Sequence, residues 1–380
     1  MEYKKLGDIA TYINGYAFKP EDRGNEGLPI IRIQDLTGNS YDLGFYNGEY
    51  PEKIEINDGD VLISWSASLG VYVWNRGKAL LNQHIFKVAF DKLDIDKSYF
   101  VYAVRHKLDE MTSKTHGATM KHIVKKDFDA TQIPYPSLEE QAEIASNLDR
   151  VSRIIEARKV ELEKLDELIK ARFVEMFGDP FGNPKGWKRI TFKEAGERLS
   201  DGPFGSNLKS EHYTEDGVRV IRLGNIGVGC FIDDDKSYIS VEHYERLKKY
   251  TCRAGEIIIG TLGEPNLRAC IVPEGVGFAI NKADCVHYIP KAEILNNAFV
   301  CQYINCPETL LLAEGMIHGQ TRSRVSSGQI AQMPIFVPPM PLQNEFAEVV
   351  HQIDKSKFVV QKTLDETRFL FDSLMQKFFG

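Results

Sequence analysis

Two stretches of the chain repeat apolar residues at the 3–4 spacing of a long helix. In the first stretch every seventh residue from Leu148 to Met176 is apolar, and in the second only Lys357 interrupts the series from Val350 to Phe378. A heptad pattern over about four repeats is typical of a coiled-coil seam. The seam positions are Leu148, Ile155, Leu162 and Ile169 in the first stretch and Val350, Leu364 and Phe371 in the second. The pattern predicts two long helices, residues 138–180 and 341–380, each roughly 60 Å long at about 1.5 Å per residue.

The other two segments, residues 1–137 and 181–340, contain short apolar runs separated by glycine and other turn residues. Gly59 and Gly255 each precede a run typical of a buried strand, and residues 86–90 have the pattern of a half-buried strand. Helical patterns occupy residues 97–112 and 295–314. We therefore predict an α+β fold in which two similar α/β globules are separated by two long antiparallel helices that resemble a coiled coil.

The chain is an internal repeat whose period is about half its length. His116-Gly117-Ala118-Thr119 recurs 202 residues later as His318-Gly319-Gln320-Thr321, and Phe177-Gly178 recurs at the same offset as Phe379-Gly380. A tandem duplication is the simplest explanation. Two helices of equal length that each return to a globule pack most simply as an antiparallel pair, with the globules at opposite ends and an approximate two-fold axis between them. A register with Leu148 opposite Phe378 would also place Arg172 opposite Asp354.

Composition limits the class of protein. The chain has 380 residues, 43% of them hydrophobic, with 47 Lys+Arg against 54 Asp+Glu and a net charge of −7. Its longest apolar runs are far shorter than the roughly 20 residues of a membrane helix. The N-terminus has no signal-peptide pattern, so we expect a cytoplasmic protein. All six cysteines lie in the second half without a C-x-x-C pair, which favours buried thiols and no metal site.

Two similar heads at a fixed spacing suit a partner with its own two-fold symmetry, and duplex DNA is such a partner because half-sites recur at about 34–36 Å. The overall charge is negative, but cations gather locally at residues 114–126 and again at the equivalent residues 318–324. Such cations contact phosphates, while Arg, Asn, Gln, Ser and Thr at strand ends can read bases. The candidate DNA-binding residues are Arg32, Gln34, Ser64, Ser66, Ser68, Thr119, Lys121, His122, Lys125, Lys126, Arg222, Asn225, Thr261, Asn266, Thr321, Arg322 and Arg324.

These motifs resemble the specificity subunits of type I restriction–modification systems. The resemblance rests on the repeated Gly-x-Thr segment, on Ile-x-x-Pro-x-Leu-x-x-Gln at residues 133–141, and on the Phe-Gly that ends each long helix. The second copy departs from the pattern at Met340-Pro341-Leu342. The resemblance implies that residues 1–137 and 181–340 are target recognition domains for double-stranded DNA, joined by a central and a distal spacer helix. It also implies that the helices dock two methyltransferase subunits, which recruit motor-nuclease subunits and bind S-adenosylmethionine.

Motifs for catalysis are missing from the sequence. No phosphate-binding G-x-x-x-x-G-K-[ST] loop and no H-E-x-x-H zinc motif occurs, so we expect a non-catalytic subunit that binds no cofactor itself. The acidic outer face of the first long helix, from Glu139 to Glu167, is expected to meet partner helices. Two alternatives remain: a two-headed scaffold that clamps a protein dimer instead of DNA, and a decoy that competes for methyltransferase subunits.

Overall fold

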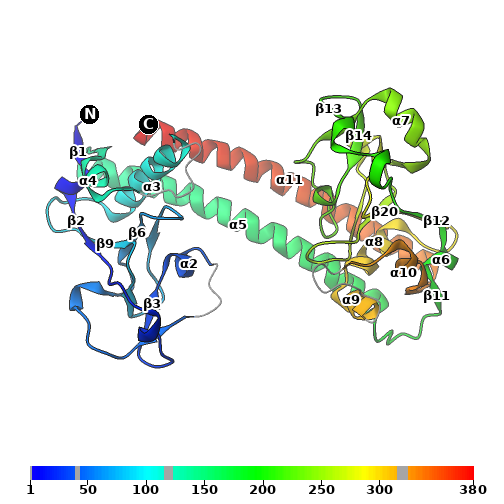
Figure 1. The fold of residues 1–380 in the computed structure, drawn as a ribbon, viewed down its shortest axis with the longest axis horizontal. Coiled ribbons are helices and arrows are strands. Elements are labelled where there is room, and N and C mark those ends of the chain that lie inside the picture. Colours follow the sequence, from blue (N-terminus) through cyan, green and yellow to red (C-terminus); the bar gives the residue numbers. More distant parts are fainter. Residues whose placement is uncertain (1, 39–42, 115–122, 315–323) are drawn as a thin grey trace. The chain divides into compact units, whose positions relative to one another are not determined.

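The computed structural model describes residues 2–38, 43–114, 123–314 and 324–380. The chain divides into two compact units, Met1–Lys159 with Lys362–Gly380 and Val160–Gln361. Each unit holds one head together with parts of both long helices (Figure 1). We call residues 1–137 head 1, which belongs to the first unit, and residues 181–339 head 2, which belongs to the second.

Head 1 combines short helices with strands in its described residues. The strands pair in the orders β2-β9-β6-β7, β4-β3-β8-β5 and β1-β10. The strands are β1 (Tyr3–Lys5), β2 (Thr11–Asn14), β3 (Leu28–Ile31), β4 (Phe45–Tyr46), β5 (Glu55–Ile56), β6 (Val61–Ser64), β7 (Gly70–Val73), β8 (Ala79–Leu81), β9 (Ile85–Ala89) and β10 (Gln132–Pro134). The α-helices are α1 (Leu6–Ile9), α2 (Ile33–Leu36), α3 (Lys97–Lys114) and α4 (Lys125–Ala130).

Head 2 repeats the strand order of head 1 and adds one strand, β13, at the edge of its second sheet. Its strands pair as β12-β20-β17-β18, β13-β15-β14-β19-β16 and β11-β21 in the described residues. They are β11 (Arg189–Thr191), β12 (Gly196–Ser200), β13 (Tyr213–Thr214), β14 (Val218–Ile221), β15 (Ser237–Ile239), β16 (Thr251–Arg253), β17 (Ile257–Gly260), β18 (Arg268–Ile271), β19 (Phe278–Asn281), β20 (Cys285–Pro290) and β21 (Pro334–Phe336). The parallel pair β3–β8 of head 1 has its counterpart in the parallel pair β14–β19. The predicted α+β class and internal repeat are confirmed.

The helices of head 2 differ from the prediction at one place. They are α6 (Phe192–Ala195), α7 (Val241–Leu247), α8 (Asn297–Asn305), α9 (Pro307–Glu314) and α10 (Ser327–Gln332). We predicted one helix over residues 295–314, and this was wrong because the helix is broken at Cys306. Pro307 lacks the N–H that would continue α8, and proline suits the first position of a new helix. In head 1 the helix predicted over residues 97–112 is α3.

The two long helices are α5 (Leu138–Phe177) and α11 (Met340–Phe379), 40 residues each and equivalent at the offset of 202. Gly178 ends α5 with a left-handed φ of 80°. Glycine is required there, because a Cβ would lie 2.6 Å from Cγ of Pro184. The predicted boundaries were residues 138–180 and 341–380, so each end lies within three residues of the expected one.

Within each unit the two long helices pack in opposite directions, as predicted. In unit 1 the early α5 residue Leu148 shares a core with Met375 and Phe379 from the end of α11. In unit 2 the late α5 residue Ile169 shares a core with Phe346 and Ile353 from the first half of α11. Of the seven seam positions, Leu148, Ile169 and Leu364 are buried and Ile155, Leu162, Val350 and Phe371 are half-buried.

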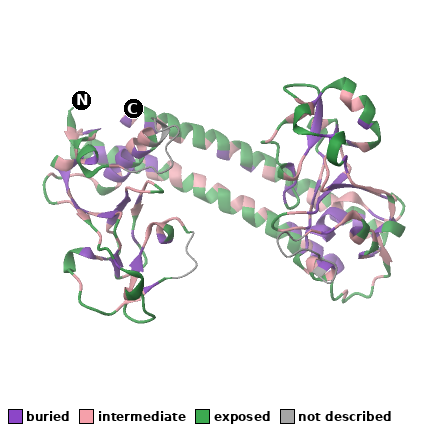
Figure 2. Cartoon of the chain, viewed as in Figure 1, coloured by how far each residue is buried: buried purple, intermediate pink, exposed green. Residues whose placement is uncertain are grey.

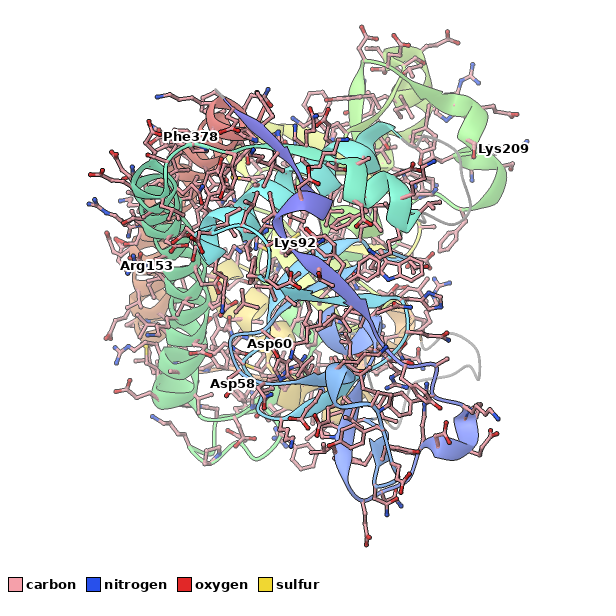
Figure 3. The ribbon with its side chains drawn as sticks, turned by 90° about the vertical axis from the view of Figure 1, so that its left-hand side faces the viewer. Asp58, Asp60, Lys92, Arg153, Lys209 and Phe378 are labelled. Carbon is pink, nitrogen blue, oxygen red and sulfur yellow. The ribbon has the colours of Figure 1, made fainter. Side chains whose placement is uncertain are left out.

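The predicted register of the seam was wrong. Phe378, labelled in Figure 3, is half-buried and packs against the edge of the core that contains Leu148, whereas Met375 and Phe379 are buried within that core. In unit 2 Arg172 bonds Glu175 of its own helix at 2.6 Å, and the ion pair between the helices joins Lys357 to Asp166 at 2.5 Å. The shift is close to one helical turn, and the run of apolar residues at the end of α11 allows either register.

A buried glutamine joins each head to its long helix. In unit 1 the Gln141 carboxamide accepts a hydrogen bond from the Asp96 backbone N–H at 2.9 Å and donates one to the Pro136 carbonyl at 2.9 Å. In unit 2 Gln343 accepts from the Asn296 backbone N–H at 2.9 Å and donates to the Pro338 carbonyl at 2.8 Å. Both joints use only backbone groups of the head, and both fix the start of a head helix on the start of a long helix.

Each head also has an acidic and a basic side chain paired at an equivalent position, but the residue types differ between the heads. Asp60, labelled with Asp58 in Figure 3, lies 2.8 Å from Nζ of Lys87 in head 1. At the same place in head 2, Glu256 lies 2.8 Å from Nε2 of the fully buried His287. Burial holds the pKa of His287 below its ordinary value; the neighbouring Arg198 acts in the same direction and Glu256 opposes it.

His287 therefore predicts a pH dependence of the stability of unit 2. An unfolded histidine takes up a proton near pH 6.5, whereas the folded head keeps His287 neutral to lower pH. Stability is thus full above about pH 6.5 and falls as the pH drops below it. The Tm of the wild type should fall between about pH 7.5 and pH 5.5. In His287→Gln we expect that fall to be smaller by about 2–4 °C. Thermal denaturation at the two pH values checks this, and equal losses in both proteins would contradict it.

Candidate nucleic-acid interface

Three separate segments of head 1 meet where its strands end. The Ile123 N–H, within the predicted basic segment, donates to the Trp65 carbonyl in the β6–β7 loop at 3.0 Å. The Trp65 N–H donates to the carbonyl of His84 in the β8–β9 turn at 3.3 Å. We call this group of segments, residues 64–69, 82–84 and 123–126, loop junction 1. It brings predicted base-reading and phosphate-binding positions together.

Head 2 builds the same junction from equivalent residues. The Val325 N–H donates to the Thr261 carbonyl at 3.2 Å, and the Thr261 N–H donates to the Asp284 carbonyl at 3.1 Å. A β-bridge joins Leu262 to Arg324. His84 and Asp284 both have a left-handed φ, 72° and 68°. We call residues 261–267, 281–284 and 324–327 loop junction 2.

Loop junction 1 carries cations beside aromatic rings. Lys125 is exposed; its Nζ lies 2.9 Å from Asp129 and about 5.6 Å from the centre of the Tyr12 ring. Lys126 is exposed too. Trp65 is half-buried and stacks on Phe86 with ring centres 5.5 Å apart. The predicted residues Thr119, Lys121 and His122 lie outside the described residues.

Loop junction 2 carries a single described cation from the predicted set. Nη2 of Arg324 lies 2.9 Å from Asp284, and its guanidinium is 5.9 Å from the centre of the Phe204 ring. Asn266 is half-buried in the loop between β17 and β18. The predicted residues Thr321 and Arg322 lie outside the described residues.

Three predicted base readers have their polar groups engaged within the fold. The buried Ser64 hydroxyl donates to the Ser68 carbonyl at 2.5 Å, and the buried Thr261 hydroxyl donates to the Asp284 carbonyl at 3.0 Å. The buried Asn225 carboxamide donates to the carbonyls of Ile232 and Asp235. These side chains stabilise loops, so this geometry does not support a DNA contact for them. Ser66 is half-buried and Ser68 is exposed.

Equivalent arginines flank the junctions but differ in accessibility. The Arg32 and Arg222 backbone N–H groups donate to Asp35 and Asn225 three residues later, which closes the same turn in both heads. The Arg32 side chain is only 12% exposed, with Nε 3.0 Å from the Asp35 carboxylate. The Arg222 side chain is 43% exposed and bonds Asp235 at 2.8 Å. Of the two guanidiniums, that of Arg222 is the more exposed. Gln34 is exposed on α2.

Sequence reasoning did not find several residues of the junctions. The sequence around His84 and Asp284 indicates only a turn and no binding site. Phe204 could not be linked to Arg324, because the two are far apart in sequence. Arg268 is the clearest omission, because its guanidinium bonds four backbone carbonyls beside loop junction 2. The partners of Arg268 are up to 45 residues away, and no local pattern could reveal them.

Five cysteines are buried and Cys230 is exposed, and all six are free thiols. Burial raises the pKa of the Cys285, Cys301 and Cys306 thiols to about 12. Among the residues that the structure describes, no group of three or more His, Cys, Asp or Glu side chains could hold a metal ion. Over the same residues, no helix has the length and apolar character to cross a bilayer.

Comparisons with known proteins bear on this arrangement. A family model described as "Type I restriction modification DNA specificity domain" matches residues 1–165. The type I restriction enzyme EcoBI specificity subunit of Escherichia coli is 23% identical over 98% of this chain and 84% of its own. The MjaVIII specificity subunit of Methanocaldococcus jannaschii is 24% identical over 93% of this chain and 86% of its own. This chain resembles type I specificity subunits. The likeness extends over nearly all of its length.

A solved structure supports the fold. The crystal structure of the type I restriction–modification S subunit from M. genitalium has a TM-score of 0.56 with 16% identity, covering 100% of this chain and 96% of that one. At this identity the likeness shows the fold alone, and it agrees with the two α/β heads and two long helices. The likeness in sequence is thus to type I specificity subunits, and the likeness in structure is one of fold.

Proposed function

We propose that this chain is the DNA-specificity subunit of a type I restriction–modification complex, in which each head reads one half of a bipartite, asymmetric DNA site. The observation that carries the proposal is the pair of loop junctions. Both heads assemble the same three segments with the same backbone hydrogen bonds, but they present different side chains. A shared framework with different side chains suits two half-sites of similar geometry and different sequence.

The long helices set the spacing between half-sites and dock two methyltransferase subunits. Support comes from apolar side chains on the helices that face solvent, where Figure 2 marks exposed residues in green. Phe358 is 72% exposed and Phe369 is 76% exposed on α11. Leu168 and Leu370, equivalent at the offset of 202, are both nearly half exposed. Large apolar residues in solvent mark a surface for partners, so apolar contacts supplement the acidic face expected from sequence.

The partner subunits carry out the catalysis in the complex. The methyltransferase subunits bind S-adenosylmethionine and carry out methyl transfer, and motor-nuclease subunits join the complex through them. This chain positions both on DNA in the cytoplasm and catalyses no step. Purified chain alone is expected to show no methyl transfer to DNA, measured with labelled S-adenosylmethionine, and turnover by the isolated chain would contradict the assignment.

The decisive experiment maps methylated bases. The chain is co-expressed with a methyltransferase subunit of known activity, and modified adenines are located across the host genome by single-molecule sequencing. One split, asymmetric motif with an unread gap supports the proposal. An intact co-purified complex without modification would favour the scaffold or the decoy.

A double variant in which two exposed phenylalanines are replaced tests the docking surface. We expect Phe358→Ala with Phe369→Ala to weaken methyltransferase binding about 30- to 1,000-fold, because exposed aromatic side chains are frequent hot spots. The thermal stability of the free chain should stay within about 1 °C of the wild type. Phe346→Ala is the matched control, because Phe346 is fully buried on the same helix and its loss should lower Tm through a core cavity. Isothermal titration with the methyltransferase subunit measures the affinity, and thermal denaturation measures Tm. Unchanged affinity of the double variant would exclude this surface as the docking site.

A further inference from the structure

Arg268 clamps the loop between β17 and β18 onto the neighbouring turn of head 2. Its Nη1 donates to the carbonyls of Leu262 and Pro265 in that loop at 2.9 and 2.8 Å. Its Nε donates to the Ile226 carbonyl at 2.6 Å, and its Nη2 donates to the Leu223 carbonyl at 3.1 Å. A planar guanidinium that bonds four backbone carbonyls holds both segments in one fixed geometry.

Head 1 holds its equivalent loop by a different device. In the β17–β18 register Arg268 is opposite Gly260, and in the β6–β7 register Gly70 is opposite Ser64. Gly70 thus occupies the position of Arg268, and the Ser64 hydroxyl holds the head 1 loop through the carbonyls of Ser68 and Gly70. The guanidinium clamp is therefore specific to head 2, within the part of the chain that the structure describes.

The clamped loop presents one side chain suited to reading a base. Thr261 and Leu267 are buried, and Leu262 forms the bridge to Arg324. The polar side chains that remain are those of Glu264 and Asn266, which form no hydrogen bond within the described residues. A carboxylate only accepts hydrogen bonds, so among the base edges it suits the cytosine N4 amino group alone, and the DNA phosphates repel it. A carboxamide, by contrast, donates and accepts together and matches the N6 and N7 edge of adenine.

We propose that Asn266 reads an adenine in the half-site of head 2 and that Arg268 is the positioning residue that fixes its loop. The inference rests on the proposed function and assigns one base contact within it. Arg324, bridged to the same loop through Leu262, lies where a basic side chain would contact the adjoining phosphate. Arg268 touches no DNA itself in this arrangement and acts only through the loop geometry. Such fixed geometry is what separates a base reader from a flexible polar side chain.

The test uses the full complex of this chain with its methyltransferase subunit, and the readout is the methylation motif. We expect Asn266→Ala to raise methylation of sites with another base at one position about 10- to 100-fold relative to the wild type. That position should be an A·T pair in the half-site of head 2, while the other half of the motif stays unchanged. Arg268→Met should relax the same position, because the loop loses its clamp. Glu264→Ala is the matched control in the same loop and should leave the motif unchanged.

Each other outcome overturns the inference. An unchanged motif in Asn266→Ala, or relaxation in Glu264→Ala instead, would remove Asn266 as the reader. Relaxation of the whole half-site in Arg268→Met, with a lowered Tm, would make Arg268 a structural residue of head 2 and not a positioning residue. The methylation motif of the wild type distinguishes a failure of this inference from a failure of the proposed function. A split motif in the wild type with no effect of the variants rejects only the inference, and the absence of any split motif in the wild type rejects the proposed function as well.

Discussion

Reversing the charge of Lys125, Lys126 and Arg324 to glutamate should lower the affinity for the recognised DNA on the order of 100- to 1,000-fold near physiological salt. These are the described cations among the candidate DNA-binding residues of the predicted basic segments, and they lie at the two loop junctions. Each lost phosphate contact should also reduce the slope of log affinity against log salt by about 0.9. Fluorescence anisotropy with labelled duplex at several salt concentrations gives both quantities.

The control for this prediction reverses the charge of two lysines elsewhere on the heads. Lys53 and Lys248 are exposed and lie outside the loop junctions, so Lys53→Glu with Lys248→Glu should change affinity much less. Folding should survive in both proteins, because the Lys125–Asp129 pair is largely exposed and the Arg324–Asp284 pair is partly exposed, and such ion pairs stabilise little. If DNA binding is unaffected while methyltransferase binding persists, the protein-clamping scaffold becomes the better explanation.

The helices and the repeat could be predicted because their signals are local or recur. Heptad spacing needs only the order of apolar residues, and the residues around Gly178 mark the helix end without tertiary information. The register between helices was not predictable in the same way. Leu374, Met375, Phe378 and Phe379 are all apolar, so several registers bury similar area and only packing selects one.

The candidate site was predictable as a region but not residue by residue. A polar residue after a strand has the same sequence pattern whether its side chain faces inward, as in Ser64 and Thr261, or outward, as in Ser68. The loop junctions depend on hydrogen bonds between segments about 20 to 60 residues apart, which local patterns do not encode. The exposure of Phe358 and Phe369 could not be predicted for the same reason. An apolar residue in a helix is expected to be buried, and only the packing of the two helices shows that these two side chains face solvent.

Replacing head 1 should change one half of the methylation motif and leave the other half intact. The reason lies in the joint at Gln141, whose carboxamide bonds only the backbone N–H of Asp96 and the backbone carbonyl of Pro136. Any head with the same backbone supplies these groups whatever its side chains. A chimera that keeps residues 138–380 and takes residues 1–137 from a related specificity subunit is therefore expected to fold and to combine one old half-site with one new one.

The reciprocal chimera is the control, because Gln343 forms the same joint with Asn296 and Pro338 and replacing residues 181–339 should change the opposite half-site. Gln141→Leu tests the joint itself. It leaves the part-buried Asp96 N–H without its acceptor and should destabilise the wild type and the first chimera alike by about 1–3 kcal/mol. Methylation mapping and thermal denaturation read the two effects separately. A motif that changes in both halves after one replacement would show that the heads do not read DNA independently, because a side chain of one head would then determine the base contacts of the other.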